Sequence, residues 1–275
     1  MRKANDEIMA IPDGGEQAPA VPRILTKAGV FLAVAFVGAG ALGVAQSAIR
    51  LPTEVIQLTQ FGPALGVAVV ALLWPLGVRS TLAGAFRSRG RPWGRGLLLP
   101  ATALLIIGLC VTAYGLITGE VRFTRPSALD NPFAVIVVAQ LIGACGEEIG
   151  WRCFLQPLLR TRFGPLVSSI AVGVLWGVWH VQIFAQDPAY AGAFLLAAVS
   201  MSVVMGLALD QVRSSRLLLA GGFHTLINLG LLLFMDEESG AILPMALFGA
   251  VCLVAALLWT WRAPAKTYRT PDHVR

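Results

Sequence analysis

Eight apolar runs follow one another along the chain, separated by short polar breaks. Most of the runs approach or exceed the roughly 20 residues that a helix needs to cross the hydrocarbon core of a bilayer. We therefore predict an all-α fold, a polytopic membrane protein built as a bundle of about eight transmembrane helices. The runs cover residues 28–46, 61–78, 96–119, 131–159, 163–185, 189–212, 217–235 and 242–261.

The composition supports this reading and excludes other classes. Hydrophobic residues make up 56% of the 275 residues and charged residues only 13%, whereas soluble domains carry about 25% charge. A typical soluble enzyme and a disordered chain are both excluded. The four cysteines, which form no C-x-x-C pair, are interpreted as small buried hydrophobes; they are Cys110, Cys145, Cys153 and Cys252.

The distribution of positive charge predicts the orientation. When the loops are assigned alternately to two sides, 18 of the 21 Lys and Arg residues fall on the side of the N-terminus. Only Arg50, Arg122 and Arg125 fall opposite, together with the acidic cluster 236–238. Cytoplasmic loops carry the excess of Lys and Arg, so we expect both termini to be cytosolic and the protein to lie in the cell membrane. The net charge of +6 then reflects topology and contact with membrane lipid, and no nucleic-acid partner is expected.

The same pattern divides the chain into four parts. Residues 1–27 are predicted to be a flexible cytosolic tail, and residues 28–130 hold the first three transmembrane helices with their loops. Residues 131–235 carry the polar motifs and form the predicted catalytic core, and residues 236–275 hold the last helix and a cytosolic tail. The run 28–46 is interpreted as an uncleaved first helix rather than a signal peptide, because seven more runs follow it.

Ionisable side chains inside a span are costly and are candidates for function. In the fourth run, Glu148 and Arg152 are i,i+4 neighbours that can form an ion pair within the helix. Glu147 points about 100° away and is free to face a cavity. The alternative is that all three residues only mark a helix end near Arg160 and Arg162.

Two further motifs place polar side chains in the fifth and seventh runs. Trp176 and His180 are i,i+4 neighbours, so the indole can shield the imidazole and fix its rotamer. His224 and Asn228 have the same spacing and can direct an imidazole N–H and an amide N–H to one point. Taken alone, His180 is as well explained by a structural role, and the second pair by hydrogen bonding between helices. Glycines beside each motif would let the helices approach closely.

Together these residues could form the site of a hydrolase. Glu147 would act as the general base on a water that His180 also holds, and His180 would relay the proton to the leaving amine. His224 and Asn228 would form the oxyanion hole. No Ser or Cys is well placed as a nucleophile, so a covalent mechanism is not expected.

The three motifs resemble those of the CPBP family, the type II CAAX prenyl protease and bacteriocin-processing membrane proteins. The family motifs read E-E-x-x-x-R, F-x-x-x-H and H-x-x-x-N/D. This chain has Glu147-Glu148-x-x-x-Arg152, Trp176-x-x-x-His180 and His224-x-x-x-Asn228 in that order, with Trp in place of the family Phe. The resemblance implies an eight-helix intramembrane endopeptidase with a cavity open to the cytosolic side. It also implies the roles given above, with Glu148, Arg152 and Trp176 supporting the site.

The resemblance further implies cleavage of a membrane-associated protein or peptide, including a lipidated, CAAX-like one. We expect no cofactor. The nearest alternative is a zinc protease whose ligands are Glu147, His180 and His224, and a second is a non-catalytic immunity or transport protein. The sequence favours no oligomeric state.

Overall fold

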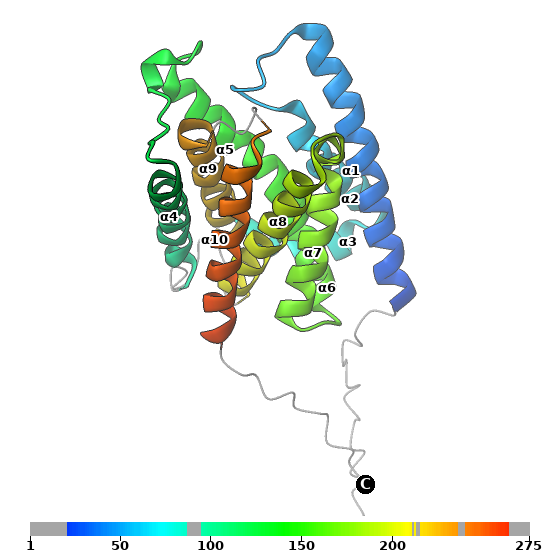
Figure 1. Ribbon diagram of the computed structural model, residues 1–275. Helices are drawn as coiled ribbons and strands as arrows, with labels where there is room; N and C mark the ends of the chain where they lie inside the picture. Colours follow the sequence, from blue (N-terminus) through cyan, green and yellow to red (C-terminus); the bar gives the residue numbers. More distant parts are fainter. Residues whose placement is uncertain (1–20, 87–94, 211, 213–214, 236–239, 264–275) are drawn as a thin grey trace, which may run out of the picture.

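The computed structural model describes residues 21–86, 95–210, 212, 215–235 and 240–263, and within these ranges the chain is helical without a strand. The predicted all-α class is confirmed. Figure 1 shows the helices arranged as one bundle. The helices are α1 (Val21–Ile49), α2 (Gly62–Leu73), α3 (Pro75–Phe86), α4 (Leu98–Thr118), α5 (Phe133–Gly150), α6 (Gln156–Arg160), α7 (Pro165–Trp179), α8 (Pro188–Leu209), α9 (Arg216–Phe234) and α10 (Ile242–Trp261). Short 3₁₀ segments are η1 (Leu58–Phe61), η2 (Arg95–Leu97), η3 (Pro126–Ala128) and η5 (Val181–Ala185), and η4 (Trp151–Leu155) is a π-helix.

Among the described residues, six helical segments are long and apolar enough to cross a membrane. Six of the eight predicted runs correspond to them. The other two runs contain shorter helices, so the predicted count of about eight spans is not reached by length alone. The six segments are Pro22–Ile49, Leu98–Thr118, Phe133–Arg160, Pro188–Leu209, Arg216–Phe234 and Ile242–Trp261.

The run 61–78 is interrupted at Trp74. Trp74 has a non-helical backbone (φ −138°, ψ 65°), and α3 begins directly after it at Pro75. Proline disfavours the helical conformation in the residue before it and cannot donate a backbone hydrogen bond. The run therefore forms two helices of 12 residues each rather than one span.

The run 163–185 is interrupted at His180. α7 has 15 residues and ends at Trp179, and His180 leaves the helical conformation with ψ 63°. Its Nδ1–H donates to the carbonyl oxygen of Trp176 at 2.8 Å, the acceptor that its backbone N–H would use in a continuing helix. The backbone N–H of His180 donates instead to the carbonyl oxygen of Gly177. The i,i+4 spacing from Trp176 had suggested that His180 lies inside a helix. In the structure it lies at a helix end.

Helix α1 begins at Val21, inside the segment 1–27 predicted as a tail. Pro22 lies in its first turn, where the missing N–H of proline has no intrahelical partner to lose. The remainder of that tail, residues 1–20, and the acidic cluster 236–238 lie outside the described residues.

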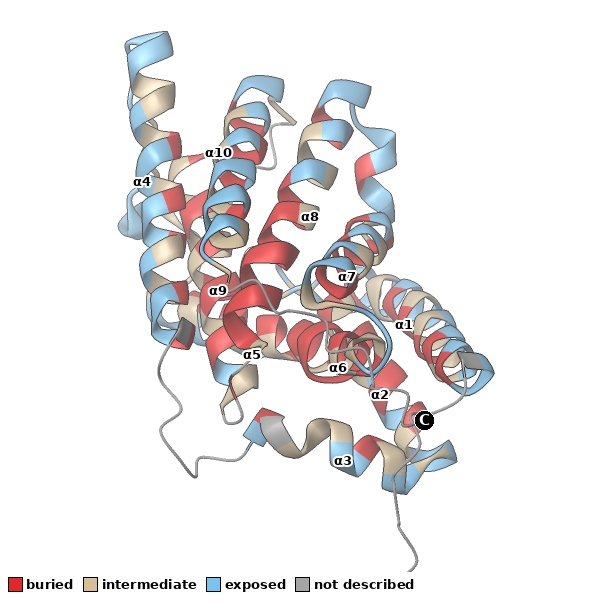
Figure 2. Ribbon diagram, turned by 90° about the horizontal axis from the view of Figure 1, so that it is seen from below, coloured by how far each residue is buried: buried red, intermediate tan, exposed pale blue. Residues whose placement is uncertain are grey.

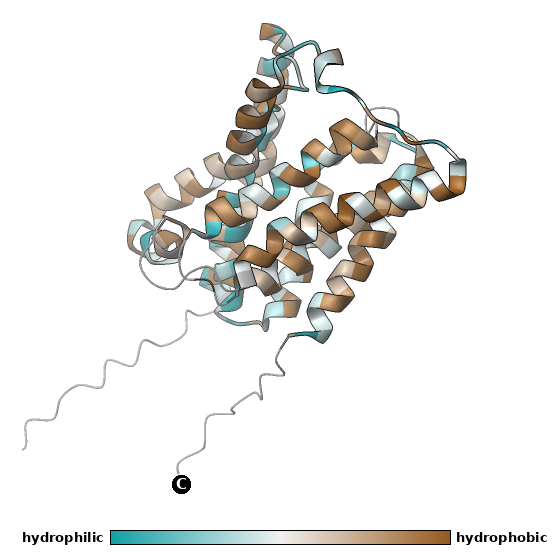
Figure 3. Ribbon diagram, turned by 90° about the vertical axis from the view of Figure 1, so that its left-hand side faces the viewer, coloured by the Kyte–Doolittle hydropathy of each residue, from teal (hydrophilic) through white to brown (hydrophobic). Residues whose placement is uncertain are grey.

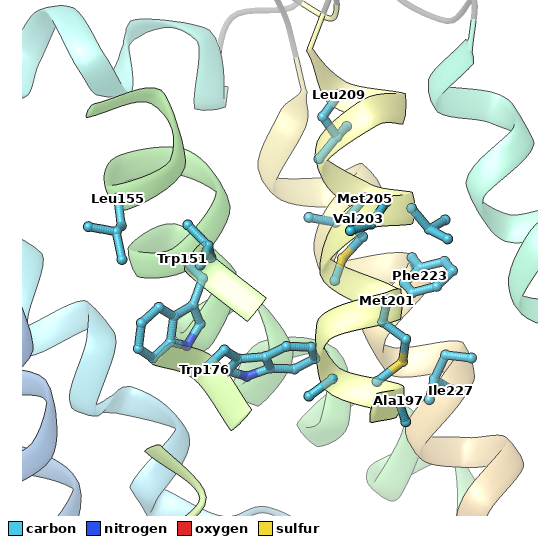
Figure 4. Packing of buried hydrophobic residues seen from close by; sticks show 14 of the residues in the cluster. Trp151, Leu155, Trp176, Ala197, Met201, Val203, Met205, Leu209, Phe223 and Ile227 are labelled. Atoms are coloured by element: carbon cyan, nitrogen blue, oxygen red, sulfur yellow. The ribbon is translucent and has the colours of Figure 1, made fainter. Parts of the chain in front are cut away.

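Helix α8 forms the centre of the bundle and packs against α7 and α10. Figure 2 shows the buried residues concentrated on α8 and on the adjoining parts of α5 and α9. In Figure 4, Met201 and Met205 of α8 lie close to Phe223 and Ile227 of α9. Outward faces are apolar as well, with Leu72 and Leu116 more than four-fifths exposed, and Figure 3 shows hydrophobic residues along most of the helices. Such a surface suits contact with lipid.

Glycines allow the closest helix approaches. A Cβ at Gly173 of α7 would lie 2.7 Å from the Cα of Val199 on α8. A Cβ at Gly221 of α9 would lie 2.6 Å from Cys145 Sγ on α5. These contacts bring α7 against α8 and α9 against α5, which are the helices that carry the polar motifs.

The two ends of the bundle differ in charge. The start of α1 and the end of α10 lie at the same end (Figure 1). Described basic residues gather there: Arg23, Lys27, Arg160, Arg162, Arg216 and Arg262. Beyond the opposite helix ends lie Arg50, Arg122 and Arg125 together with Glu54, Glu120, Asp130 and Asp187. The fold therefore separates these described charges as the alternating loop assignment predicted, except that Arg152, which the assignment counted on the basic side, is buried beside Glu148.

Candidate active site

Glu147 and Trp176 form the central contact of the site. Glu147 lies on the last turn of α5 and is only 2% exposed. Its Oε2 accepts a hydrogen bond of 2.8 Å from Trp176 Nε1 on α7. As the sequence suggested, the Trp176 ring packs against the His180 ring, edge-on with centroids 5.7 Å apart. Its indole N–H also reaches the carboxylate of the neighbouring helix, which the sequence did not predict. Trp176 also supplies the carbonyl that binds His180, so a single residue contacts both groups.

Glu148 points to the other side of α5 and is fully buried. It forms the predicted ion pair with Arg152, with 3.5 Å between Glu148 Oε2 and Arg152 Nε. Its Oε1 also accepts a hydrogen bond from His224 Nδ1 at 2.9 Å, a contact that the sequence did not predict. Glu148 therefore connects α5 to α9 and fixes the orientation of the His224 ring.

Arg152 lies in the π-helix η4, directly after α5. Its guanidinium stands over the Trp176 ring, with the Cζ atom 4.7 Å from the centroid. A guanidinium over an indole is a favourable cation–π arrangement. π-Helical turns are rare and are often found at functional sites, and this one positions Arg152 between the carboxylate of Glu148 and the indole.

The imidazole of His180 is held by hydrogen bonding and by aromatic packing. The Nδ1–H donates to the Trp176 carbonyl, so in the neutral ring Nε2 carries the lone pair. The ring packs edge-on against Trp179 and Phe194, each with a centroid distance of 5.0 Å. Nε2 is therefore the nitrogen that can accept a proton from a bound molecule.

Asn228 is anchored by a residue that the sequence reasoning missed. Asn228 Nδ2 donates to Gln140 Oε1 at 3.0 Å, and Gln140 Nε2 donates to the backbone oxygen of Glu54 at 3.3 Å. Gln140 is buried and lies on α5, seven residues before Glu147 and so on nearly the same helix face. That spacing, together with an amide in an apolar run, is the signal in the sequence that points to Gln140.

All four predicted catalytic residues line one cavity of about 430 Å³: Glu147, His180, His224 and Asn228, with Trp176 beside them. The volume falls in the range of ligand-binding pockets. Glu148 and Arg152 do not line it. Apolar side chains such as Phe194, Met201 and Ile227 form much of its wall. The cavity thus combines a few polar groups with an apolar surface.

The cavity extends from the middle of the bundle to one end. Its outer residues come from the segment after α1, from η5 and from Gln186, which precedes α8. These segments lie at the end opposite the start of α1 and the end of α10 (Figure 1). The mouth of the cavity and the basic end of the bundle are therefore on opposite sides.

A metal centre was the alternative for this cavity. Glu147, His180 and His224 would have to converge on one point, but among the described residues no group of three or more His, Cys, Asp or Glu side chains is arranged to hold a metal ion. Both imidazoles pack edge-on against Trp176 instead. In the described residues these three side chains are therefore held by other contacts and not as a ligand set.

Residues 129–230 match the family described as type II CAAX prenyl endopeptidase Rce1-like. The match includes every residue of the site from Gln140 to Asn228. This part of the chain is therefore similar to that family. It is 30% identical over 173 residues to CAAX prenyl protease 2 of Methanococcus maripaludis, a match that covers 59% of this chain and 62% of the relative.

The chain is also similar to lysostaphin resistance protein A. The identity is 21% over 213 residues for the protein of Staphylococcus aureus strain MRSA252 (77% of this chain, 50% of the relative). It is 22% over 237 residues for that of Staphylococcus haemolyticus (83% and 65%). The matches span between half and two thirds of the length of these relatives. The match to the Rce1-like model and the six long apolar helices among the described residues together support a multi-pass membrane protein.

Proposed function

We propose that the protein is an intramembrane endopeptidase that hydrolyses a peptide bond of a membrane-associated protein or peptide. The proposed substrates include lipidated, CAAX-like ones. The observation that carries the proposal is the pairing of a buried carboxylate and an imidazole in one cavity, both held by Trp176. A buried carboxylate and a base-competent imidazole within a membrane domain are the groups that activation of a water requires.

In this mechanism Glu147 takes a proton from a water that His180 Nε2 also binds, while the water oxygen attacks the peptide carbonyl carbon. The resulting tetrahedral oxyanion is stabilised by donors from His224 and by the second amide hydrogen of Asn228. As the C–N bond breaks, Glu147 gives up this proton through His180 Nε2 to the leaving nitrogen, which restores the Glu147 carboxylate and the neutral imidazole. The products are a carboxylic acid and an amine.

His224 can donate to the oxyanion only if Nε2 carries a proton while Nδ1–H remains bonded to Glu148. The ring is then an imidazolium, and the buried carboxylate of Glu148 compensates its charge. The Glu148–His224 contact therefore supports the assigned role of His224 and gives Glu148 a function distinct from that of Glu147.

The proposed mechanism uses no metal, and the zinc enzyme with Glu147, His180 and His224 as ligands is its alternative. Metal analysis of active purified protein distinguishes the two. We expect full activity after extensive dialysis against a chelator. Stoichiometric zinc together with loss of activity on chelation would replace the glutamate mechanism with the metal mechanism.

Glu147→Gln tests the endopeptidase itself, because it keeps the shape of the side chain and removes the base. Membrane peptides from cells with the wild type, Glu147→Gln or the exposed control Glu120→Gln are compared by mass spectrometry. We expect an uncleaved peptide to accumulate only with Glu147→Gln. If a phenotype of the protein survives Glu147→Gln but is lost when the bundle is destabilised, the protein is a non-catalytic immunity or transport factor.

Two expectations about orientation belong to this proposal. The charge distribution predicts cytosolic termini, and the family resemblance implies a cytosolic opening of the cavity. The exposed residues of the cavity lining belong to segments at the end of the bundle opposite the helix ends next to the termini, so a test of one expectation bears on the other.

A further inference from the structure

We propose that a second cavity, at the basic end of the bundle, is a binding site for a phosphate group. The cavity has a volume of about 240 Å³. No described residue lines both this cavity and the one that contains Glu147. The inference therefore concerns a separate site and does not depend on the proposed endopeptidase activity.

The cavity lies where three parts of the chain meet. Its first wall comes from η4, α6 and the residue after α6, its second from the end of α8, and its third from the start of α9. α6 lies at the same end of the bundle as the start of α1 and the end of α10 (Figure 1). The polar groups that matter below are Arg152, Gln156 and Arg160 in the first wall, Asp210 in the second and Arg216 in the third.

Arg152 lines the cavity with donors that have no partner. The residue is only 2% exposed, and its Nη1 and Nη2 form no hydrogen bond with the described residues. The ion pair with Glu148 is made through Nε. Buried polar groups in proteins are nearly always hydrogen-bonded, and a guanidinium has five N–H donors. A ligand with several acceptor oxygens would therefore complete the hydrogen bonding of Arg152.

Arg216 brings a second guanidinium to the cavity from the start of α9. Its Nη2 donates to the backbone oxygen of Thr81 at 3.2 Å. Its Nε is buried and has no hydrogen-bond partner among the described residues. Guanidinium groups bind phosphate and carboxylate through paired N–H donors. Arg152 and Arg216 thus provide donors from two different helical segments to one cavity.

The charges around the cavity do not balance in the described part of the chain. Arg160 Nε donates to Asp210 Oδ1 at 2.6 Å. Arg152 is paired with Glu148, which does not line the cavity. Arg216 takes part in neither ion pair. Three guanidinium groups therefore stand against two carboxylates, and a bound anion with one negative charge, such as a phosphodiester, would balance them.

Gln156 adds a preference for a hydroxyl group beside the phosphate. Its Nε2 donates to Ser169 Oγ at 3.0 Å, and its buried Oε1 has no partner among the described residues. A free amide oxygen accepts a hydrogen bond from a hydroxyl. The headgroup of phosphatidylglycerol and free glycerol 3-phosphate both combine a phosphate with hydroxyl groups. Their small size also suits a cavity below the roughly 300 Å³ at which pockets for drug-sized ligands begin.

The position of the cavity favours the lipid as the source of the phosphate. It lies at the end of the bundle where the described basic residues gather, and Thr161 on its lining is exposed. Basic pockets between transmembrane helices bind the headgroups of anionic lipids. A phosphate held there by Nη1 and Nη2 would also fix the guanidinium that stands over Trp176.

Lipid competition tests the site. The protein, purified in a neutral detergent, is mixed with equal amounts of phosphatidylglycerol and phosphatidylcholine, and the bound lipid is measured by native mass spectrometry. We expect several-fold more phosphatidylglycerol on the wild type, and no preference with Arg216→Gln. The matched control is Arg162→Gln, which removes an exposed charge at the same end outside the described lining; it should keep the preference.

A parallel measurement distinguishes a lipid headgroup from a free phosphate. The melting temperature is followed with inorganic phosphate, with glycerol 3-phosphate and with chloride at the same ionic strength. A bound ligand raises the melting temperature. A rise that requires Arg216, without preference for phosphatidylglycerol, would assign the site to a free phosphate compound. Absence of both effects, or equal effects of Arg216→Gln and Arg162→Gln, would overturn the proposal.

A second pair of variants covers the case in which Arg216→Gln does not fold. Thr161→Glu places a carboxylate on the exposed rim of the cavity, and Thr161→Gln places a neutral side chain of the same shape there. We expect Thr161→Glu to retain several-fold less phosphate ligand than Thr161→Gln, because like charges repel. Equal retention by the two variants would contradict binding in this cavity.

Discussion

Trp176→Phe isolates one hydrogen bond of the site. The family motif has Phe at this position, so the smaller ring is compatible with the fold, and the variant removes the Nε1–H that donates to Glu147 Oε2 at 2.8 Å. The backbone carbonyl that binds His180 is unchanged. We expect slower cleavage with the variant because the proposed base loses the donor that fixes its orientation.

The size of the effect follows from the burial of both partners, each 2% exposed. A hydrogen bond to a charged group contributes about 1.5–3 kcal/mol, and each 1.4 kcal/mol corresponds to about a tenfold change in rate. If the whole contribution acts in the transition state, the cleavage rate falls by about 10-fold to 150-fold. A partial contribution gives a smaller loss.

The assay follows the initial rate of cleavage of the peptide that accumulates with Glu147→Gln, together with the melting temperature of the purified protein. Trp151→Phe is the matched control. Trp151 is also fully buried, and its Nε1–H has no hydrogen-bond partner among the described residues. We expect Trp176→Phe to lose activity and Trp151→Phe to keep it. Equal rates for both variants would refute the role given to the indole N–H.

Three further changes test the surroundings of the site. Glu148→Gln leaves the buried guanidinium of Arg152 without its counter-charge, so we expect a loss of about 3–5 kcal/mol in stability, measured by denaturant unfolding, and loss of activity. Gln140→Leu removes the acceptor that orients the proposed oxyanion-donor amide; we expect about a tenfold lower cleavage rate with the melting temperature nearly unchanged. Gly173→Ala places a methyl group against α8 and should destabilise the protein by about 1–3 kcal/mol. The control Gly192→Ala, with no atom within 4 Å of the new Cβ, should have no such cost.

The sequence predicted the helical class, the apolar runs and the residues of the three motifs. These features depend on local patterns: the number of consecutive apolar residues, and the i,i+4 spacing that placed Glu148 beside Arg152. The break at Trp74 was also within reach of the sequence, because Pro75 follows it directly. Because the residues on both sides of Pro75 are apolar, the run 61–78 was nevertheless predicted to be a single span.

Contacts between helices could not be predicted in the same way. The bond from Trp176 to Glu147 joins residues 29 apart in sequence, and that from Asn228 to Gln140 joins residues 88 apart. Such pairs depend on how helices pack, which spacing along one helix does not specify. The end of α7 could not be predicted from the sequence either. The side-chain N–H of His180 takes the place of its backbone N–H at the carbonyl of Trp176, and no proline marks the position.

The short length of α7 has a consequence for the membrane around the protein. Its 15 residues extend about 22 Å, less than the roughly 30 Å of a bilayer core, while Val174 and Val178 remain exposed on its outer face. A helix shorter than the hydrocarbon core is accommodated by local thinning of the bilayer. Where the bilayer thins at this helix, interfacial water would come closer to His180, and the proposed hydrolysis consumes one water for each bond cleaved. Hydrophobic mismatch would then couple the acyl-chain length of the surrounding lipid to the supply of a reactant.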